Sequence, residues 1–226
     1  MIGVDAIVVD NDKHLLSEEK LAIAVERLEQ NYDPKCELES GNPYQFLVSI
    51  ILSAQATDKS VNAATPDLFA IAPSPATMLD LGEEKLREHI SSIGLYRNKA
   101  KNIIAMSTML NEKFDGAVPS DYDSLIALPG VGRKSAHVFM NSMFGADVVA
   151  VDTHVFRLSH RLGISKGKTP IAVERDIVEK IPPPARVNIS HLLVLHGRYV
   201  CKAKKPECAS CVLRDLCPRI GVAEIS

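Results

Sequence analysis

With 226 residues, of which 46% are hydrophobic and 24% charged, the chain is long enough for one or two domains with hydrophobic cores. No apolar run approaches the length of a membrane span, and the first residues lack the basic and apolar regions of a secretory signal, so we expect a cytoplasmic protein. The net charge of -2 favours no polyanionic partner by itself, so any contact with nucleic acid has to come from local clusters.

Helical patterns follow one another along the chain, and no segment has the alternation typical of a strand. Residues 1–14 show no clear pattern and are left unassigned. A first helix is expected after the capping residue Ser17, and a second, apolar on nearly all sides, after Asn42-Pro43. Short helical pieces follow until Gly94, and a long helix covers about residues 97–113. The pattern predicts an all-α fold with about ten helices.

The sequence LPGVG lies between a short helix and an apolar helix that begins at Arg133, which together make a helix-hairpin-helix unit at about residues 122–141. Pro129 presets its own φ, and Gly130 and Gly132 can take positive φ. The first N–H groups of the second helix have no partner within the helix, so they and the helix dipole favour a phosphate. We expect this hairpin to hold a nucleic-acid backbone through Gly130, Gly132 and Arg133.

Lys134 lies in the first turn of that apolar helix and is the candidate for covalent chemistry. The helix dipole disfavours a cation at this end, more so if the side chain is partly buried. A lysine held neutral is a nucleophile that can form a Schiff base. The alternative from the residues alone is a solvated lysine at an ordinary helix start.

Three further helices are expected after the hairpin, at about residues 152–162, 169–181 and 186–199, the last following a helix-breaking run of prolines at 182–184. Asp152, at the start of the first of these, is by residue type and position a helix cap.

Four of the five cysteines lie in the C-terminal tail with the spacing Cys-x6-Cys-x2-Cys-x5-Cys. Four thiolates can enclose one soft metal centre, either zinc or an iron-sulfur cluster, and the spacing does not separate these. A disulfide pair is the remaining alternative. Cys36 is expected to be a buried thiol rather than a fifth ligand. The four candidate ligands are Cys201, Cys208, Cys211 and Cys217.

The same tail is basic, with six Lys or Arg residues and two acidic residues between His196 and Arg219. Lys202, Lys204 and Lys205 lie between the first two cysteines, so a metal centre would hold them on one projection that can follow phosphates. A charged run of this kind is otherwise a solvated surface.

Five segments and the four-cysteine tail together closely resemble the bacterial endonuclease III family, DNA glycosylases with AP-lyase activity in the helix-hairpin-helix superfamily. The resemblance covers nearly everything from Leu15 to Pro218, and the motifs occur in the order of the family. The segments are ILSAQATD (51–58), IGLYRNKAKNI (93–103), LPGVGRKSA (128–136), AVDTHVFRL (150–158) and HGRYVC (196–201).

The resemblance implies two helical lobes with a DNA-binding cleft between them. An N-terminal helix at 15–36 would join a cluster lobe at 147–226, which contains the four-cysteine loop 201–217, and a six-helix lobe would occupy 37–146. The implied activity is removal of oxidised or otherwise damaged pyrimidines from double-stranded DNA, followed by cleavage 3′ to the abasic site by β-elimination. The enzyme is expected to act as a monomer.

The resemblance also assigns residues. Lys134 matches the catalytic lysine of the family and Asp152 its catalytic aspartate. Gln55 matches the residue inserted into the space left by an extruded nucleotide, and Leu95 an apolar residue that helps to open the duplex. The four tail cysteines match the ligands of a [4Fe-4S] cluster. From the residues alone, structural roles are expected for His154, His191 and His196, because single histidines offer no set of metal ligands.

Two other functions are weighed against this one. An adenine-mismatch glycosylase of the same superfamily would carry a catalytic glutamate where this chain has Ile50 and a non-lysine residue at position 134. It would also carry an extra domain, whereas this chain ends nine residues after Cys217. A non-enzymatic DNA-binding or electron-carrying module would not need Lys134 and Asp152 together.

Overall fold

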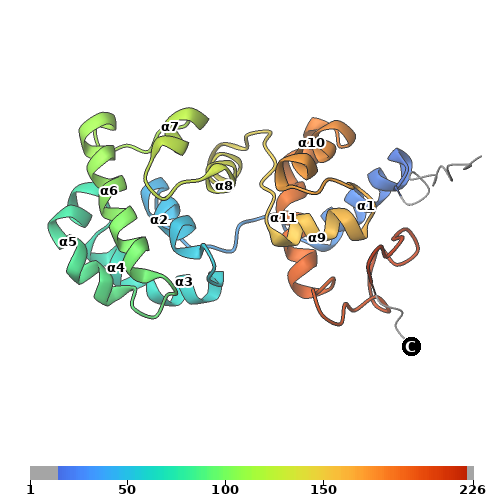
Figure 1. Ribbon diagram of the computed structural model, residues 1–226, viewed down its shortest axis with the longest axis horizontal. Helices are drawn as coiled ribbons and strands as arrows, with labels where there is room; N and C mark the ends of the chain where they lie inside the picture. The colour runs from blue at the N-terminus through green and yellow to red at the C-terminus, as the bar shows by residue number, and fades with distance from the viewer. Residues whose placement is uncertain (1–14, 223–226) are drawn as a thin grey trace, which may run out of the picture. The chain divides into compact units, whose positions relative to one another are not determined.

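The computed structural model describes residues 15–222, so the unassigned residues 1–14 lie outside the described part of the chain. Within that part every regular element is a helix, which confirms the predicted all-α fold (Figure 1). The helices are α1 (Glu18–Asn31), α2 (Pro43–Ser53), α3 (Asp58–Ala64), α4 (Pro66–Ile71), α5 (Pro75–His89), α6 (Tyr96–Phe114), α7 (Tyr122–Ala127), α8 (Arg133–Phe144), α9 (Thr153–Arg161), α10 (Pro170–Lys180) and α11 (Pro183–Tyr199).

The chain divides into two compact units. The continuous unit consists of residues 35–150 and contains α2 to α8. The discontinuous unit combines the described residues 15–34 and 151–222, and its helices are α1 and α9 to α11. Because the first and last parts of the sequence meet in the discontinuous unit, its core cannot form from one stretch of chain.

Side-chain caps begin the helices where the sequence predicts them. The Ser17 hydroxyl accepts a hydrogen bond from the Lys20 backbone N–H at 3.4 Å, and Asn42 accepts from the Gln45 N–H at 2.9 Å. Thr169 caps α10 in the same way. Each cap satisfies an N–H group that has no partner inside the helix, which is why these residue types mark the starts.

Helix α2 is the centre of the continuous unit. Every residue from Tyr44 to Leu52 is buried, which confirms the prediction of a buried helix from its all-round apolar sequence. The helix packs against α3, α6 and α8, and the Phe46 ring stacks on Phe139 of α8 with ring centroids 6.0 Å apart. The hairpin helix α8 is therefore fixed to the core along one face.

The predicted start of the last helix is wrong by one turn. Helix α11 begins at Pro183 with Pro182 as its N-cap, not near Arg186 after the prolines. A proline in the first turn has no N–H to lose and its φ suits a helix, so the run starts the helix rather than only ending the previous one.

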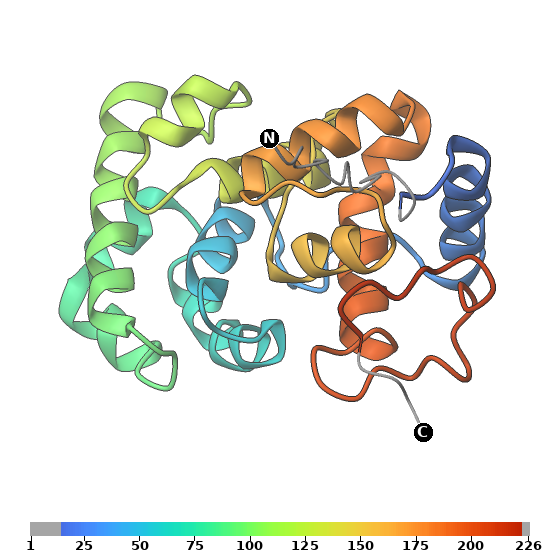
Figure 2. The ribbon, with the colours of Figure 1, turned by 45° about the vertical axis from the view of Figure 1, so that its right-hand side comes forward.

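In the discontinuous unit, α11 packs against α1, α9 and α10. After α11 the chain continues as a segment of turns without a helix from residue 200 to 222, passing close to α1 (Figure 2). We call residues 201–222 the cysteine segment. No helix in the described part of the chain is both long enough and apolar enough to cross a membrane.

Candidate active site and metal centre

The hairpin turn between α7 and α8 depends on one glycine for its geometry. Gly130 has a φ of +83°, and a Cβ there would lie 3.0 Å from Cβ of Asn102 on α6. Gly132 is the N-cap of α8 with a φ of -100°, so of the two glycines that can take positive φ only Gly130 does so. No side chain caps α8, which leaves its N-terminal turn open to an anion.

Lys134 lies in this first turn of α8, and its side chain is exposed. The buried face of the same helix carries Ala136, His137 and Phe139, and the His137 Nδ1 atom lies 2.9 Å from the Val149 carbonyl oxygen. The helix is thus held on one face and presents the lysine amine on the other. The partial burial that would favour a neutral amine is not present here.

Arg133, beside the lysine, is held by the preceding helix. Its Nη1 atom donates to the Tyr122 hydroxyl at 3.1 Å, and its guanidinium lies 5.6 Å from the centroid of the same ring. The side chain is exposed, so the ring orients the cation without removing it from solvent.

Gln55 and Leu95 share an uncommon backbone conformation. Their φ values are +56° and +61°, in the left-handed region, although neither is a glycine. Gln55 is exposed two residues after the end of α2, and Leu95 is the N-cap of α6 with 58% of its surface exposed. A left-handed non-glycine residue costs on the order of 1 kcal/mol or more, and such residues are enriched at functional sites.

Asp152 lies in the discontinuous unit, whereas Lys134 lies in the continuous unit. The Asp152 Oδ1 atom accepts hydrogen bonds from the N–H groups of His154 and Val155, both at 2.8 Å, which confirms it as the N-cap of α9. Its second oxygen, Oδ2, accepts no hydrogen bond from a described residue. One carboxylate can therefore cap the helix and still offer an oxygen to a substrate.

The four cysteines of the tail line one cavity. Nowhere among residues 15–222 do three His, Cys, Asp or Glu side chains lie close enough to hold a single metal ion. Four cysteine thiolates are a usual ligand set of an iron-sulfur cluster, so the lining of this cavity fits such a group.

Burial raises the pKa of the Cys211 and Cys217 thiols. Metal binding would have to offset this to hold both as thiolates at neutral pH. Backbone N–H groups already point at these sulfur atoms: that of Leu213 lies 3.4 Å from Cys211 Sγ, and that of Arg219 lies 3.4 Å from Cys217 Sγ. Both contacts would stabilise a bound thiolate.

His196 links the cavity to the N-terminal helix. It is buried, its Nε2 atom lies 3.4 Å from Cys211 Sγ, and its Nδ1 atom lies 2.9 Å from the Tyr32 hydroxyl at the end of α1. Burial lowers the pKa of His196 to about 4. A metal-bound thiolate can only accept, so a neutral ring here would donate from Nε2 and accept from Tyr32 at Nδ1.

Two arginines of α9 hold the start of the cysteine segment. Arg161 donates to the carbonyl groups of Lys202 at 2.7 Å and Ala203 at 3.0 Å, and Arg157 donates to the Cys201 carbonyl at 3.1 Å. Arg157 also donates to the Gly197 carbonyl at 3.0 Å. A side chain at position 197 would crowd this contact, because its Cβ would lie 3.0 Å from the guanidinium.

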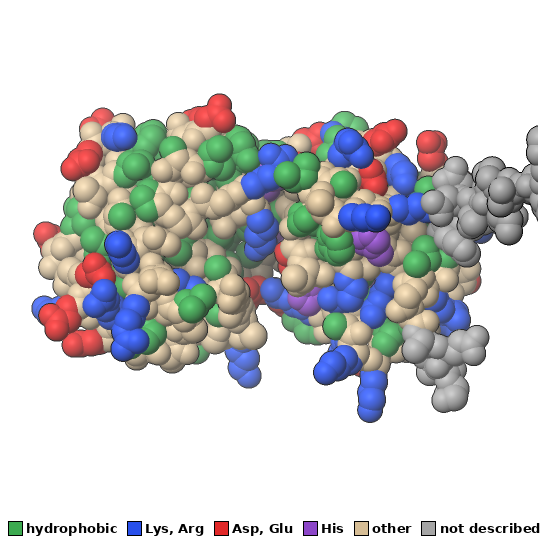
Figure 3. Space-filling view, in the orientation of Figure 1, with side chains coloured by type: hydrophobic (Ala, Val, Ile, Leu, Met, Phe, Trp, Pro, Cys, Tyr) green, Lys and Arg blue, Asp and Glu red, His purple; other side chains and the backbone are tan. Residues whose placement is uncertain are grey.

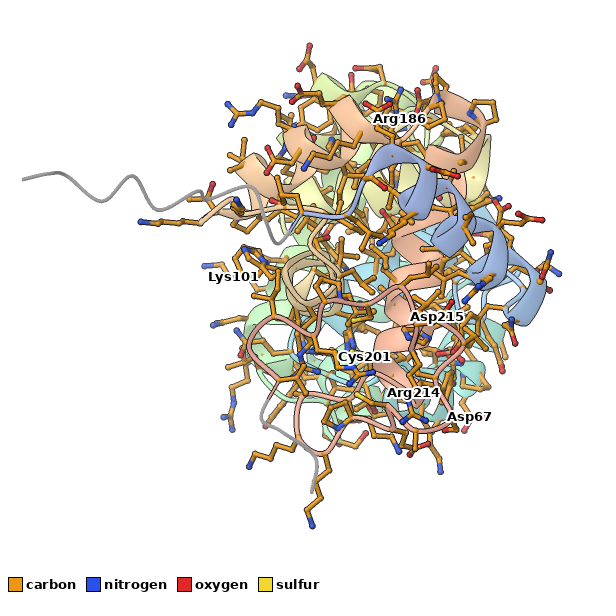
Figure 4. The ribbon with its side chains drawn as sticks, turned by 90° about the vertical axis from the view of Figure 1, so that its right-hand side faces the viewer. Asp67, Lys101, Arg186, Cys201, Arg214 and Asp215 are labelled. Atoms are coloured by element: carbon orange, nitrogen blue, oxygen red, sulfur yellow. The ribbon has the colours of Figure 1, made fainter. Side chains whose placement is uncertain are left out.

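A third arginine holds the middle of the segment from α1. Arg27 donates to the Val212 carbonyl at 2.9 Å and pairs with Asp215 at 2.6 Å. Figure 4 labels Asp215 and Cys201, which lie on different stretches of the same segment. Side chains from both ends of the chain thus hold this segment in place.

Lys202, Lys204 and Lys205 are all exposed, and Lys and Arg side chains project from the surface around this segment (Figure 3). The three are not equivalent, because Lys202 pairs with Glu207 at 2.5 Å. Because Glu207 balances the charge of Lys202, the positive charge of this loop that it leaves is that of Lys204 and Lys205.

The sequence predicts only a structural role for His196 and gives no local signal for Arg157, Arg161 or Lys99, whose partners lie 40 or more positions along the chain. The HGRYVC motif contained a signal for His196, since it places a histidine five residues before the first cysteine. Cys36 is partly buried against the core of the continuous unit, in a different unit from the four tail cysteines.

Two family models match the chain: "HhH-GPD superfamily base excision DNA repair protein" over residues 48–183, and "Iron-sulfur binding domain of endonuclease III" over residues 201–217. The second match begins at Cys201 and ends at Cys217.

Curated relatives and solved structures agree with these matches. Endonuclease III of Rickettsia conorii is 50% identical over 83% of this chain and 89% of its own length, and that of Escherichia coli K12 is 46% identical over 88% and 94%. A solved structure of a trapped endonuclease III–DNA covalent intermediate is 40% identical, with a TM-score of 0.85 over 90% of this chain and 96% of that one. A non-covalent endonuclease III–DNA complex matches equally well. The chain therefore belongs to the endonuclease III family of the HhH-GPD superfamily.

Proposed function

We propose that Lys134 and Asp152 carry out the reaction of this enzyme on damaged DNA. As a member of the endonuclease III family, the chain is a base excision repair glycosylase with AP-lyase activity, and its cofactor is a [4Fe-4S] cluster. The observation that carries the residue assignment is the exposed amine of Lys134 in the uncapped first turn of the hairpin helix.

Base release would begin with nucleophilic attack by the neutral amine of Lys134. A C–N bond forms between Nζ and C1′ of the sugar, the glycosidic bond breaks, and its electron pair leaves with the base, which takes up a proton. Opening of the sugar then gives an imine between Lys134 and C1′. The relative trapped as a DNA covalent intermediate supports a step of this kind.

Strand cleavage would follow from the imine. The imine acidifies the C2′ proton, whose removal is coupled to breaking of the C3′–O bond, so the 3′ phosphate leaves by β-elimination. Hydrolysis of the remaining imine returns the lysine. The electrons balance within the substrate and the lysine, so these steps call for no external oxidant or reductant.

Asp152 would act beside the reacting sugar. Its Oδ2 oxygen can take a proton from the Lys134 ammonium and stabilise the positive charge that develops on the sugar. The two hydrogen bonds from the start of α9 hold the carboxylate in one orientation through Oδ1. Both roles from the sequence, helix cap and catalytic group, are compatible in this arrangement.

DNA would be held through the hairpin amides at Gly130 and Gly132, with Arg133 beside them. A damaged base cannot be reached inside the stack, so the nucleotide has to be turned out. In this proposal Gln55 fills the space left by the extruded nucleotide, and Leu95 helps to open the duplex. Both side chains are exposed on the continuous unit, which supports these roles.

We assign cluster binding to the four cysteines of the tail, because they line one cavity and span the matched iron-sulfur domain. The bound cluster would tie the cysteine segment to the core and thereby orient Lys202, Lys204 and Lys205 toward phosphates. In this assignment the continuous unit, which has seven helices, takes the place of the predicted six-helix lobe, and the discontinuous unit takes the place of the cluster lobe.

Oxidised or ring-saturated pyrimidines are the proposed substrates, and the enzyme is expected to act as a monomer on DNA in the cytoplasm. The mismatch-glycosylase alternative is disfavoured by the lysine at position 134 and by Ile50 in the buried helix. A module that only binds DNA is disfavoured by the family to which the chain belongs.

Borohydride trapping on a duplex with one abasic site or one oxidised pyrimidine tests this assignment. The native protein should form a covalent adduct, and Lys134→Gln should form none and cleave at least about a thousandfold more slowly. The variant should keep its melting temperature and cluster absorbance, because residue 134 is exposed. An adduct of undiminished yield in the variant would remove Lys134 from the mechanism.

A further inference from the structure

Lys99 contacts both loops that carry the residues assigned to DNA opening. Its side chain is buried, with 5% of its surface exposed, and its Nζ atom donates to the Leu52 carbonyl at 2.9 Å. Its backbone N–H donates to the Leu95 carbonyl at 3.1 Å. One residue in the first turn of α6 therefore contacts the end of α2, three residues before Gln55, and Leu95 itself.

The Leu52 carbonyl needs this partner because α2 ends early. In a continuing helix it would accept from the Ala56 N–H, but the chain turns away at Gln55 and that N–H donates to the Ser53 carbonyl at 3.0 Å. The left-handed conformation of Gln55 and the hydrogen bond from Lys99 to Leu52 thus act together where α2 ends. Removing the amine would leave a buried carbonyl group without a hydrogen bond.

The position is an unusual one for a lysine. Burial lowers the pKa of Lys99, and no described carboxylate pairs with it. Burying an ammonium group without a counter-charge is costly, and the hydrogen bond to the Leu52 carbonyl offsets part of that cost. Through this bond the amine ties the first turn of α6, which follows Leu95, to the end of α2, which precedes Gln55.

We propose that Lys99 is a positioning residue that sets the spacing of Gln55 and Leu95, so that the two side chains enter a duplex together. This rests on the proposed roles of Gln55 and Leu95 in opening DNA. The side chain acts on the Leu52 carbonyl at the end of α2, whereas the bond to the Leu95 carbonyl comes from the backbone N–H of residue 99 as part of α6, and the lysine does not touch the substrate. Its contribution is therefore confined to steps in which the nucleotide leaves the stack.

The first test compares Lys99→Met, which keeps the aliphatic stem, with Lys101→Met. Lys101 is an exposed lysine on the same helix, labelled in Figure 4, and controls for loss of charge. Two substrates are used: a duplex with one oxidised pyrimidine, which requires extrusion, and a single strand with one abasic site, which does not.

Lys99→Met should lower the single-turnover rate on the duplex by roughly 10- to 100-fold, as a displacement of about 1 Å can do. Its rate on the single strand should change less than about threefold, as should both rates of Lys101→Met. Fluorescence of 2-aminopurine beside the lesion should show slower nucleotide extrusion. Equal losses on both substrates, or no loss on the duplex, would overturn the proposal.

A second measurement begins in the native protein, where it does not depend on folding of the Lys99 variant. In the native background, Gln55→Ala and Leu95→Ala and their combination form a double-mutant cycle on duplex extrusion. Coordinated loops should give non-additive losses, and that coupling should shrink in the Lys99→Met background. Additive losses in the native background would contradict the proposal on their own.

Failure of the underlying function gives a different result. If the native protein forms no borohydride adduct on the single-stranded abasic site, the lyase assignment fails whatever Lys99 does. If it forms the adduct but Gln55→Ala and Leu95→Ala leave extrusion unchanged, their assignment to DNA opening fails, and the proposal for Lys99 fails with it.

Discussion

The hairpin of residues 122–141 rests on a packed hydrophobic core, whereas the cysteine segment rests on side chains that reach across to its carbonyl groups. In the hairpin, Leu125, Leu128 and Phe139 are all buried. In the cysteine segment Leu213 is the only described residue that is buried. Arginines from α1 and α9 supply much of the rest of its support.

This difference separates two ways of holding a functional loop. Burial of apolar groups stabilises the hairpin without any ligand, because the gain scales with the area removed from water. A segment with one buried side chain gains little in this way and depends on hydrogen bonds and on its metal ligands. The hairpin should therefore keep its structure without iron, and the cysteine segment should lose it.

The largest expected effect comes from removing one cluster ligand. Cys208→Ala should abolish the visible absorbance of the cluster and the hydrogen-exchange protection of residues 201–222, because their main anchor is lost. Amides of the continuous unit should keep their protection. Cys36→Ala is the matched control, because Cys36 lies in the continuous unit, and it should leave iron content unchanged. Retained iron in Cys208→Ala would contradict the ligand assignment.

The core under the hairpin provides the next prediction. Phe139 is fully buried, and Phe139→Ala should lower the free energy of unfolding of the continuous unit by about 3–5 kcal/mol. Phe144 lies on the same helix, but 52% of its surface is exposed. Phe144→Ala should therefore lower the free energy of unfolding much less. Denaturant unfolding followed by hydrogen exchange measures both. Similar losses in the two variants would mean that the hairpin does not depend on core packing.

The hairpin turn allows a smaller and more local test. Gly130→Ala should destabilise the continuous unit by about 1–3 kcal/mol, because it combines a φ of +83° with a Cβ 3.0 Å from Asn102. Gly132→Ala meets open space at an ordinary φ, so only the weaker N-cap preference of alanine remains, and the loss should stay below about 1 kcal/mol. Thermal unfolding of the two variants distinguishes them. Equal destabilisation would show that the turn needs both glycines for its conformation.

The smallest effect is expected at the surface pair between α1 and the cysteine segment. The Arg27 hydrogen bond holds the pKa of Asp215 below its usual range, so the pair stabilises the fold above the unfolded pKa of about 3.9. That contribution is lost as the pH falls through the lower folded value. Arg27→Met should remove this acid dependence and raise hydrogen exchange at residues 212–217 while the cluster stays bound. Glu26→Gln serves as control, and an unchanged exchange pattern in Arg27→Met would argue against the support from α1.

Local signals in the sequence predict much of this structure. Caps such as Ser17 and Asn42, the apolar run of α2 and the glycine turn of the hairpin each act through neighbouring residues, so they can be read without tertiary information. The cysteine spacing indicates a metal centre for the same reason. The family resemblance then added an activity that these patterns could not supply.

The remaining features depend on residues far apart in the sequence. Lys99 meets Leu52 across 47 positions, and Tyr32 meets His196 across 164, so no local pattern contains either contact. The pairing of Lys202 with Glu207 is closer, but it depends on how the loop turns. The start of α11 at Pro183 differs from the prediction because a run of prolines such as 182–184 can both end one helix and form the first turn of the next.

The division of the discontinuous unit between the two ends of the chain has a consequence for biosynthesis. On a ribosome, the continuous unit is complete once residue 150 has emerged, and it can fold while α1 still lacks its partner α11. The contacts of Tyr32 with His196 and of Arg27 with Asp215 can form only after the last part of the chain has been synthesised. Iron-sulfur delivery would thus be the closing event of maturation, acting on a protein whose lysine-bearing half is already folded.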